Sequence, residues 1–191
     1  PDTFVRFSGA AYPQQTVSLL QDGGIIATTR ANSDGTFTLH TLNLTGGTYL
    51  FSVFAEDSFG QKSILTTLPV NVTKGLFTIV SDILLAPTLH TDKAQVRQGE
   101  SVEIFGQTAS RSPVNIFVSS STESLLFQTI SASTGIYRYS LFTDQLPFGE
   151  YTVQTKTLYE NSETPLSRRA LFSIGDQTIP REELELLPLR G

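Results

Sequence analysis

The sequence contains no cysteine, no methionine and no tryptophan. Without cysteine, the chain can form neither a disulfide framework nor a thiolate metal site. Any fold must therefore be held together by packing alone. Because methionine is also absent, Pro1 does not follow a retained start codon, and we expect a mature, trimmed or partial chain.

Charge is also scarce. Charged residues make up 16% of the 191 residues and the net charge is −5, whereas roughly 25% is typical of globular domains. No basic stripe is available to neutralise phosphates, so we expect no nucleic-acid partner. The longest apolar runs, such as residues 83–86, have the length of a core strand and fall far short of the ~20 residues of a membrane span. We therefore expect no membrane insertion within this segment.

An internal repeat organises what is present. Landmarks of the first half recur in the second half at a spacing of about 100 residues. The matched pairs are Phe7-Ser8-Gly9 with Ile104-Phe105-Gly106, Val17-Ser18-Leu19 with Val114-Asn115-Ile116, Asp34-Gly35-Thr36-Phe37 with Thr134-Gly135-Ile136-Tyr137, Gly47-Thr48-Tyr49 with Gly149-Glu150-Tyr151, and Gly75 with Gly175. We interpret the chain as two copies of one domain.

Each copy has the period-two pattern of β-strands. In residues 49–55, for example, Tyr49, Phe51 and Val53 fall on one face of the chain. Glycine-containing turns separate the runs, as at Asp34-Gly35 and Phe59-Gly60. Short strands separated by frequent turns predict an all-β protein made of two tandem β-sandwich domains of immunoglobulin-like type. A helical pattern occurs only in residues 182–187.

The predicted boundaries follow from the repeat. Residues 1–75 form the first domain, residues 76–86 an apolar interdomain segment, residues 87–175 the second domain and residues 176–191 a C-terminal tail. Few residues precede the Gly9 landmark compared with those before Gly106, so we expect the first domain to lack its first edge strand or part of it. Three interpretations are open: a neighbour donates a strand, upstream residues are not part of this chain, or the domain tolerates a short edge. Strand donation would build a filament by β-augmentation, with residues 176–191 as donor.

Reactive constellations are missing from the sequence. The two histidines, His40 and His90, have no second histidine or cysteine nearby, and no nucleophile elbow or phosphate-binding glycine loop is present. We predict no enzymatic activity and no bound cofactor. Calcium is the one metal considered, because carboxylates and carbonyls suit it. The candidate ligands are Glu56 and Asp57 in the densest acidic turn, with Asp82 and Asp92 near the boundary; an ordinary solvated loop is the alternative.

Candidate partner-binding residues are apolar. Phe54, Phe117 and Phe142 lie off the core-facing pattern, and Leu184, Leu186 and Leu187 lie in the C-terminal tail. Exposed aromatics on one sheet would form an interaction patch for protein or glycan. Imperfect alternation or packing between the domains is the competing interpretation.

The start of the chain, Phe7-Ser8-Gly9-Ala10-Ala11-Tyr12-Pro13, together with residues 17–23, 34–37 and 47–60, resembles bacterial immunoglobulin-like repeats. The chain lacks the cysteine pair and the tryptophan typical of animal immunoglobulin domains. The resemblance implies a non-catalytic structural or adhesive module, located outside the cell or on its surface. The implied partners are proteins, through self-association or surface assembly, or glycans. The alternatives are a filament subunit assembled by strand donation and a carbohydrate-binding accessory module.

Overall fold

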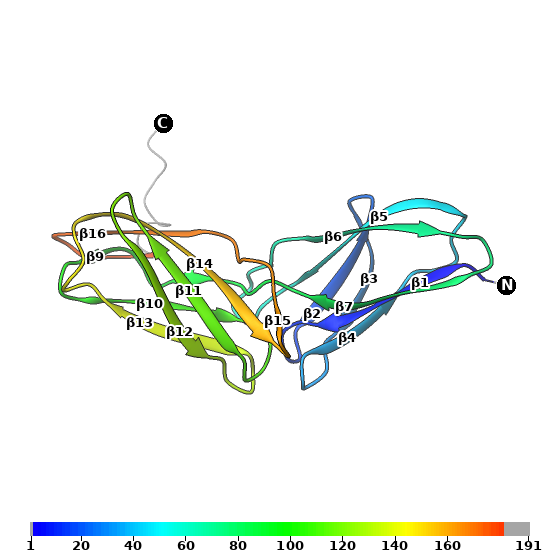
Figure 1. Cartoon of the computed structure of the whole chain (residues 1–191), viewed down its shortest axis with the longest axis horizontal. Helices are drawn as coiled ribbons and strands as arrows, with labels where there is room; N and C mark the ends of the chain where they lie inside the picture. Colours follow the sequence, from blue (N-terminus) through cyan, green and yellow to red (C-terminus); the bar gives the residue numbers. More distant parts are fainter. Residues whose placement is uncertain (1, 182–191) are drawn as a thin grey trace.

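Alternating burial is visible in many strands of the computed structural model, which describes residues 2–181. In strand β4 (Thr36–His40), for example, Phe37 and Leu39 are buried whereas Thr38 and His40 are exposed. Two β-sandwiches result, joined end to end along the long axis of the molecule (Figure 1). The all-β, two-domain prediction is confirmed.

The first domain contains seven strands in two sheets, ordered β4-β1-β7 and β3-β2-β5-β6. All pairs are antiparallel except β1 with β7, which are parallel. Besides β4, the strands are β1 (Phe4–Ala10), β2 (Thr16–Gln21), β3 (Gly24–Arg30), β5 (Gly47–Ala55), β6 (Thr66–Val72) and β7 (Phe77–Leu84).

The second domain has sheets ordered β13-β10-β8 and β12-β11-β14-β16-β9-β17, with the short β15 paired to β14. The strands are β8 (His90–Thr91), β9 (Lys93–Arg97), β10 (Ser101–Gln107), β11 (Pro113–Ser119), β12 (Ser124–Ile130), β13 (Ile136–Phe142), β14 (Gly149–Tyr159), β15 (Ser162–Glu163), β16 (Ala170–Gly175) and β17 (Ile179–Pro180). The beginning of the predicted tail thus adds a strand to this sheet, since β17 pairs with β9.

Each domain has its own hydrophobic core between its two sheets. Phe7 of β1 meets Phe51 of β5 in the first domain, with ring centroids 4.9 Å apart, and Tyr151 stacks on Phe172 in the second at 5.4 Å. Burial of these aromatic and aliphatic side chains is the main stabilising term of each sandwich, because no disulfide is available.

The two domains repeat even in their turns. Ala11 N donates to Gly35 O at 2.8 Å, and Thr108 N donates to Gly135 O at 2.9 Å. In the same loops Gln14 and Arg111 both have positive φ, 61° and 51°. A repeat that preserves unusual backbone conformations as well as core positions shows that the two halves share one local fold.

The domains differ in the strand beside the first repeated strand. In the second domain β8 precedes β10 and pairs with it antiparallel. In the first domain the equivalent place beside β1 is taken by β7, which comes last and runs parallel to β1. The predicted interdomain segment, residues 76–86, therefore contributes its residues 77–84 to the first sandwich. Since β6 ends at the far end of the domain, the next strand has to run back in the direction of β1.

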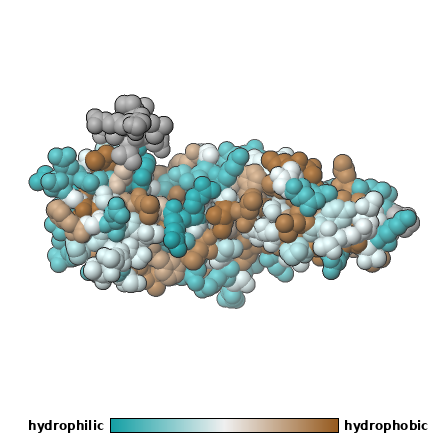
Figure 2. Space-filling view, turned by 90° about the horizontal axis from the view of Figure 1, so that it is seen from above, coloured by the Kyte–Doolittle hydropathy of each residue, from teal (hydrophilic) through white to brown (hydrophobic). Residues whose placement is uncertain are grey.

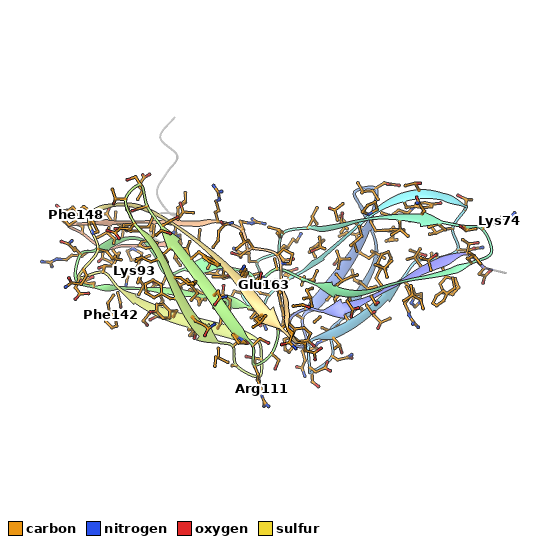
Figure 3. The ribbon with its side chains drawn as sticks, in the orientation of Figure 1. Lys74, Lys93, Arg111, Phe142, Phe148 and Glu163 are labelled. Carbon is orange, nitrogen blue, oxygen red and sulfur yellow. The ribbon has the colours of Figure 1, made fainter. Side chains whose placement is uncertain are left out.

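Strand directions place the two domains head to head. Strands β1 and β10 both run toward the middle of the molecule (Figure 1), so the repeated loops that follow them face each other. The connection between the domains, residues 85–89, is buried along its whole length. The described N-terminal residues lie at the far end of the first domain, and Lys74 labels this end in Figure 3.

Candidate functional site: the interdomain junction

A hydrogen bond between Asp57 and His90 links the two domains. Asp57, in the loop after β5, places its Oδ2 2.8 Å from Nε2 of His90 in β8. The side chain of Asp57 has no exposed surface, and that of His90 is 20% exposed. The other carboxylate oxygen, Oδ1, accepts hydrogen bonds from the backbone N–H groups of Phe59 and Gln61 at 2.9 and 2.8 Å. Asp57 therefore shapes its own loop and reaches across to the second domain.

Two opposing effects act on the pKa of Asp57. Burial raises it, whereas the hydrogen bonds from His90, Thr88 and the Gln61 backbone lower it, and the net result lies below the ordinary value. The structure thus favours the ionised carboxylate at neutral pH. A charged Asp57 is what the pair with His90 requires.

Aromatic rings surround this pair. The His90 ring stacks on Phe105 of β10, with centroids 5.1 Å apart, and the edge of Phe59 contacts both rings at 5.3 and 5.2 Å. The guanidinium of Arg138 lies over the ring of Phe105, 5.2 Å from its centroid, in a cation–π contact. Phe59 comes from the first domain, whereas His90, Phe105 and Arg138 come from the second, so the cluster packs the two domains against each other.

Two glutamines complete the connection. Gln107, only 1% exposed, accepts hydrogen bonds through Oε1 from the backbone N–H and the hydroxyl of Ser58, both at 2.8 Å. Gln61 of the first domain makes a similar contact, because its Oε1 accepts a hydrogen bond from the Leu89 backbone N–H at 3.1 Å. Buried polar groups that are satisfied across an interface fix one relative orientation.

Two buried tyrosines fasten the connecting segment itself. Tyr12 of the first domain donates its hydroxyl proton to the carbonyl of Ala86, and Tyr137 of the second donates to that of Thr88 at 2.6 Å. Burial raises the pKa of both hydroxyls far above the usual range, so they remain neutral donors. Residues 85–89 are thereby held from both sides.

The predicted calcium ligands are spread over the molecule. The carboxylate of Asp57 is hydrogen-bonded to His90. Glu56, next to Asp57 in the chain, forms a backbone β-bridge with Lys62. Asp82 is exposed in β7, and Asp92 accepts a hydrogen bond from Glu103 N at 2.8 Å and lies 3.5 Å from Lys93 Nζ. Among residues 2–181, no three histidine, cysteine or acidic side chains converge as a metal site would require.

The three predicted aromatic residues do not form one patch. Phe54 is 7% exposed, and the ammonium of Lys62 lies 5.4 Å from its ring centroid. Phe117 is half-buried, and the ammonium of Lys156 lies 5.6 Å from its ring centroid. Phe142 is 67% exposed at the far end of the second domain, where Figure 3 labels it near Phe148. Each phenylalanine belongs to a different strand, β5, β11 or β13.

Other predicted positions lie away from the junction or beyond the description. His40 is exposed in β4, with its ring 6.5 Å from that of Phe4. Leu184, Leu186 and Leu187, and the helical pattern that contains them, lie outside the described residues. In the part of the chain from residue 2 to residue 181, no helix has the length and apolar character needed to cross a membrane.

Two concave regions flank the junction. One, of about 460 Å³, lies between β1, β4 and β7 of the first domain and the β14–β15 hairpin of the second, and Asp82 and Glu160 contribute its charges. The other, of about 360 Å³, is lined by Gln61, by residues 89–91, by residues 168–171 and by Arg181. The two differ in charge, because arginines dominate the second.

Sequence reasoning missed most of the junction. It picked Asp57 as a calcium ligand, but it gave no role to Phe59, Phe105 or Gln107. A signal did exist: Asp57 and Gln61 bracket a glycine turn, a pattern typical of a carboxylate that binds its own loop. Nothing in the sequence pairs that loop with His90, because the contact depends on the domains meeting head to head.

No protein-family model matches the sequence, and no curated protein matches it either. Solved structures do resemble it, and they include tandem repeats of bacterial adhesins and fibronectin III-like modules. A tetra-tandem repeat from the extending region of a large adhesion protein is 16% identical, with a TM-score of 0.41 over 91% of this chain and 50% of that one. The present chain thus spans half the length of that structure.

Two further solved structures show a similar degree of likeness. The adhesin InvE of Yersinia pseudotuberculosis is 13% identical, with a TM-score of 0.40 over 91% of this chain and 58% of that chain. The D00–D0 domain of intimin is 15% identical, with a TM-score of 0.34 over 82% of this chain and 77% of that one. At such identities and TM-scores the likeness assigns neither a family nor a function.

Proposed function

We propose that this chain is a non-catalytic structural module of a bacterial surface or secreted protein, and that it holds two sandwich domains as a semi-rigid pair. The junction is the observation that carries this proposal. Its buried connection, its hydrogen bond between Asp57 and His90 and its aromatic cluster all join one domain to the other. A spacer needs such a junction, because freely jointed domains do not set a distance.

The chemistry of the described residues supports a module without catalysis. His90, the histidine with a buried acidic partner, is stacked against Phe105 and bonded to Asp57, and this arrangement serves the contact between domains. Packing in place of disulfides also fits the bacterial immunoglobulin-like repeats that the sequence resembles.

The alternatives gain less support. The alternative of strand donation would complete the first domain beside β1, but β7 of the same chain occupies that edge. Strands β3, β4, β6 and β7 lie at the sheet edges of this domain, and β6 contains Pro69 and therefore has one backbone donor fewer. A sugar-binding platform made of Phe54, Phe117 and Phe142 would require these residues to lie together. Phe54 belongs to the first domain, whereas Phe117 and Phe142 belong to different sheets of the second.

Small-angle scattering tests the semi-rigid pair. We expect the wild-type chain to scatter as one elongated body with the dimensions of the structure. Phe59→Ala should broaden the distribution of interatomic distances, because Phe59 is the ring that the first domain contributes to the junction cluster. Phe142→Ala, which removes an exposed ring far from the junction, is the matched control. Wild-type data that fit only two freely tumbling domains would overturn the proposal.

A further inference from the structure

The pocket of about 360 Å³ beside the junction is strongly basic. Arg168, Arg169 and Arg181 line it together with His90, and no aspartate or glutamate is among its lining residues. The chain as a whole has a net charge of −5 and only 13 lysines and arginines. A pocket lined by three arginines is therefore opposite in sign to the protein as a whole. From above, Figure 2 shows strongly hydrophilic residues gathered near the middle of the molecule.

These arginines are not neutralised by the ion pairs that the structure records. Within residues 2–181, the lysine ion pairs join Lys93 to Asp92 and Lys156 to Glu163, and the one histidine–carboxylate contact joins His90 to Asp57. Asp57 lies behind His90 and is buried, with its oxygens used by His90 and by its own loop. It therefore makes no contact with the arginines and leaves their positive potential facing the pocket.

One arginine is fixed in place before any ligand arrives. Arg181 Nη2 donates to Thr91 Oγ1 at 2.7 Å, to Lys93 O at 3.3 Å and to Leu171 O. A guanidinium has five N–H donors in a planar fork, so hydrogen bonds through one nitrogen leave others available. Arg168 and Arg169 are exposed in the segment that leads into β16 and can adjust around a bound group.

Neutral groups complete the lining. Gln61 uses its Oε1 to accept from Leu89 N, which leaves its side-chain N–H groups as donors. Leu171, 63% exposed, gives an apolar surface next to the guanidinium groups. Fixed guanidinium donors recognise planar or tetrahedral oxyanions, and an adjacent apolar surface suits the C–H face of a sugar ring. The volume lies at the small end of ligand sites and fits a group of about one sugar in size.

We propose that this pocket, shared by the two domains, binds the acidic group of a carboxylated or sulfated saccharide. The preference for an oxyanion follows from the arginines alone. The choice of a saccharide as its carrier also rests on the proposed role outside the cell. Because Gln61 belongs to the first domain and the arginines to the second, a bound ligand would contact both sides of the junction.

Titration calorimetry with defined oligosaccharides tests this site. The probes are a uronic-acid oligosaccharide, a sulfated oligosaccharide, an uncharged oligosaccharide of equal length and an oligoglutamate peptide. We expect one or both acidic saccharides to bind and the uncharged one not to bind. The double variant Arg168→Gln/Arg169→Gln should weaken that binding about ten-fold or more, since charge-assisted contacts are lost.

Arg111→Gln is the control for charge in general. Arg111 is exposed, does not line the pocket and is labelled at the lower edge of the molecule in Figure 3. The acidic residues of the C-terminal tail are the same in every variant. Equal weakening by Arg111→Gln would show diffuse electrostatics and overturn the proposal, as would binding of the uncharged probe with equal affinity.

Two other outcomes would also overturn the site. Tighter binding of oligoglutamate than of either saccharide would identify an acidic protein segment as the ligand. No binding of any acidic saccharide by a chain that still scatters as one elongated body would refute the pocket and leave the proposed spacer function intact.

Discussion

At the residue scale, Asp57 shows how one side chain organises the junction. Its carboxylate accepts two backbone hydrogen bonds in its own loop and one from His90 in the other domain. Such an arrangement works only while the carboxylate is ionised, and the lowered pKa of Asp57 expresses that coupling between charge and folding.

The coupling predicts a pH dependence. Since the pKa of Asp57 is lower in the folded chain, its stabilising contribution is present above the unfolded-state pKa of about 4 and is lost as the pH falls through the folded value. We expect Asp57→Asn to lower the free energy of unfolding near pH 7 by about 1–3 kcal/mol and to flatten its decline in acid. Urea unfolding measured from neutral to acidic pH checks this.

Asp144→Asn serves as the comparison, because Asp144 is exposed in the loop after β13. This variant should keep the wild-type acid dependence. If both variants change with pH in the same way, Asp57 has no special role in the acid sensitivity of the fold.

At the scale of elements, β7 decides how the first sandwich is closed. It lies beside β1 so closely that a Cβ added at Gly9 would be 1.9 Å from the carbonyl oxygen of Ile83. The second domain has the same relation between Gly106 and Thr88 O, at 2.1 Å. The glycine that recurs in the sequence is therefore required for the close approach of a neighbouring strand.

Gly9→Ala tests the position of β7. The added methyl group has to push β7 away from β1, so we expect a loss of about 1–3 kcal/mol in the free energy of unfolding. Gly24→Ala is the control, since its Cβ would meet only Gln21 O, at 3.8 Å, and should change stability by about 0.5 kcal/mol or less. Equal stability of the two variants in chemical denaturation would contradict the packing of β7 on β1.

At the scale of the whole molecule, the strand edges govern self-association. The edge of β1 is filled by β7 and the edge of β16 is covered by β9. Strands β3, β4, β6 and β7 lie at the sheet edges of the first domain, and Pro69 interrupts β6. Filled or interrupted edges are poor templates for pairing with another chain.

We therefore expect the chain to be monomeric at micromolar concentration. Light scattering should give the mass of one chain, 20.9 kDa, and negative-stain images should show no filaments. Filaments would instead restore strand donation, with the open edge of β6 as the acceptor.

The head-to-head arrangement also explains why the junction is well defined. Repeated loops of the two domains face each other, and the buried residues 85–89 run between them. The same meeting of loops creates the basic pocket, because it brings Gln61 of one domain next to the arginines of the other.

The sequence by itself determined the class of fold and the repeat. Alternation of apolar residues, as in residues 49–55, and turn glycines such as Gly35 and Gly135 are local signals, and strand burial and turn geometry respond to them directly. The residues of the two cores follow from the same alternation, so they too were within reach of the sequence.

Only the tertiary structure decided the pairing of distant segments. The apolar run at residues 77–84 reads equally well as a linker or as a strand, and its place beside β1 depends on the direction in which β6 ends. The contacts of Asp57 with His90 and of Gln107 with Ser58 join residues 33 and 49 positions apart. Hydrophobic periodicity shows which side of a strand is buried, but which surfaces meet is determined by topology and by the packing of one domain against the other.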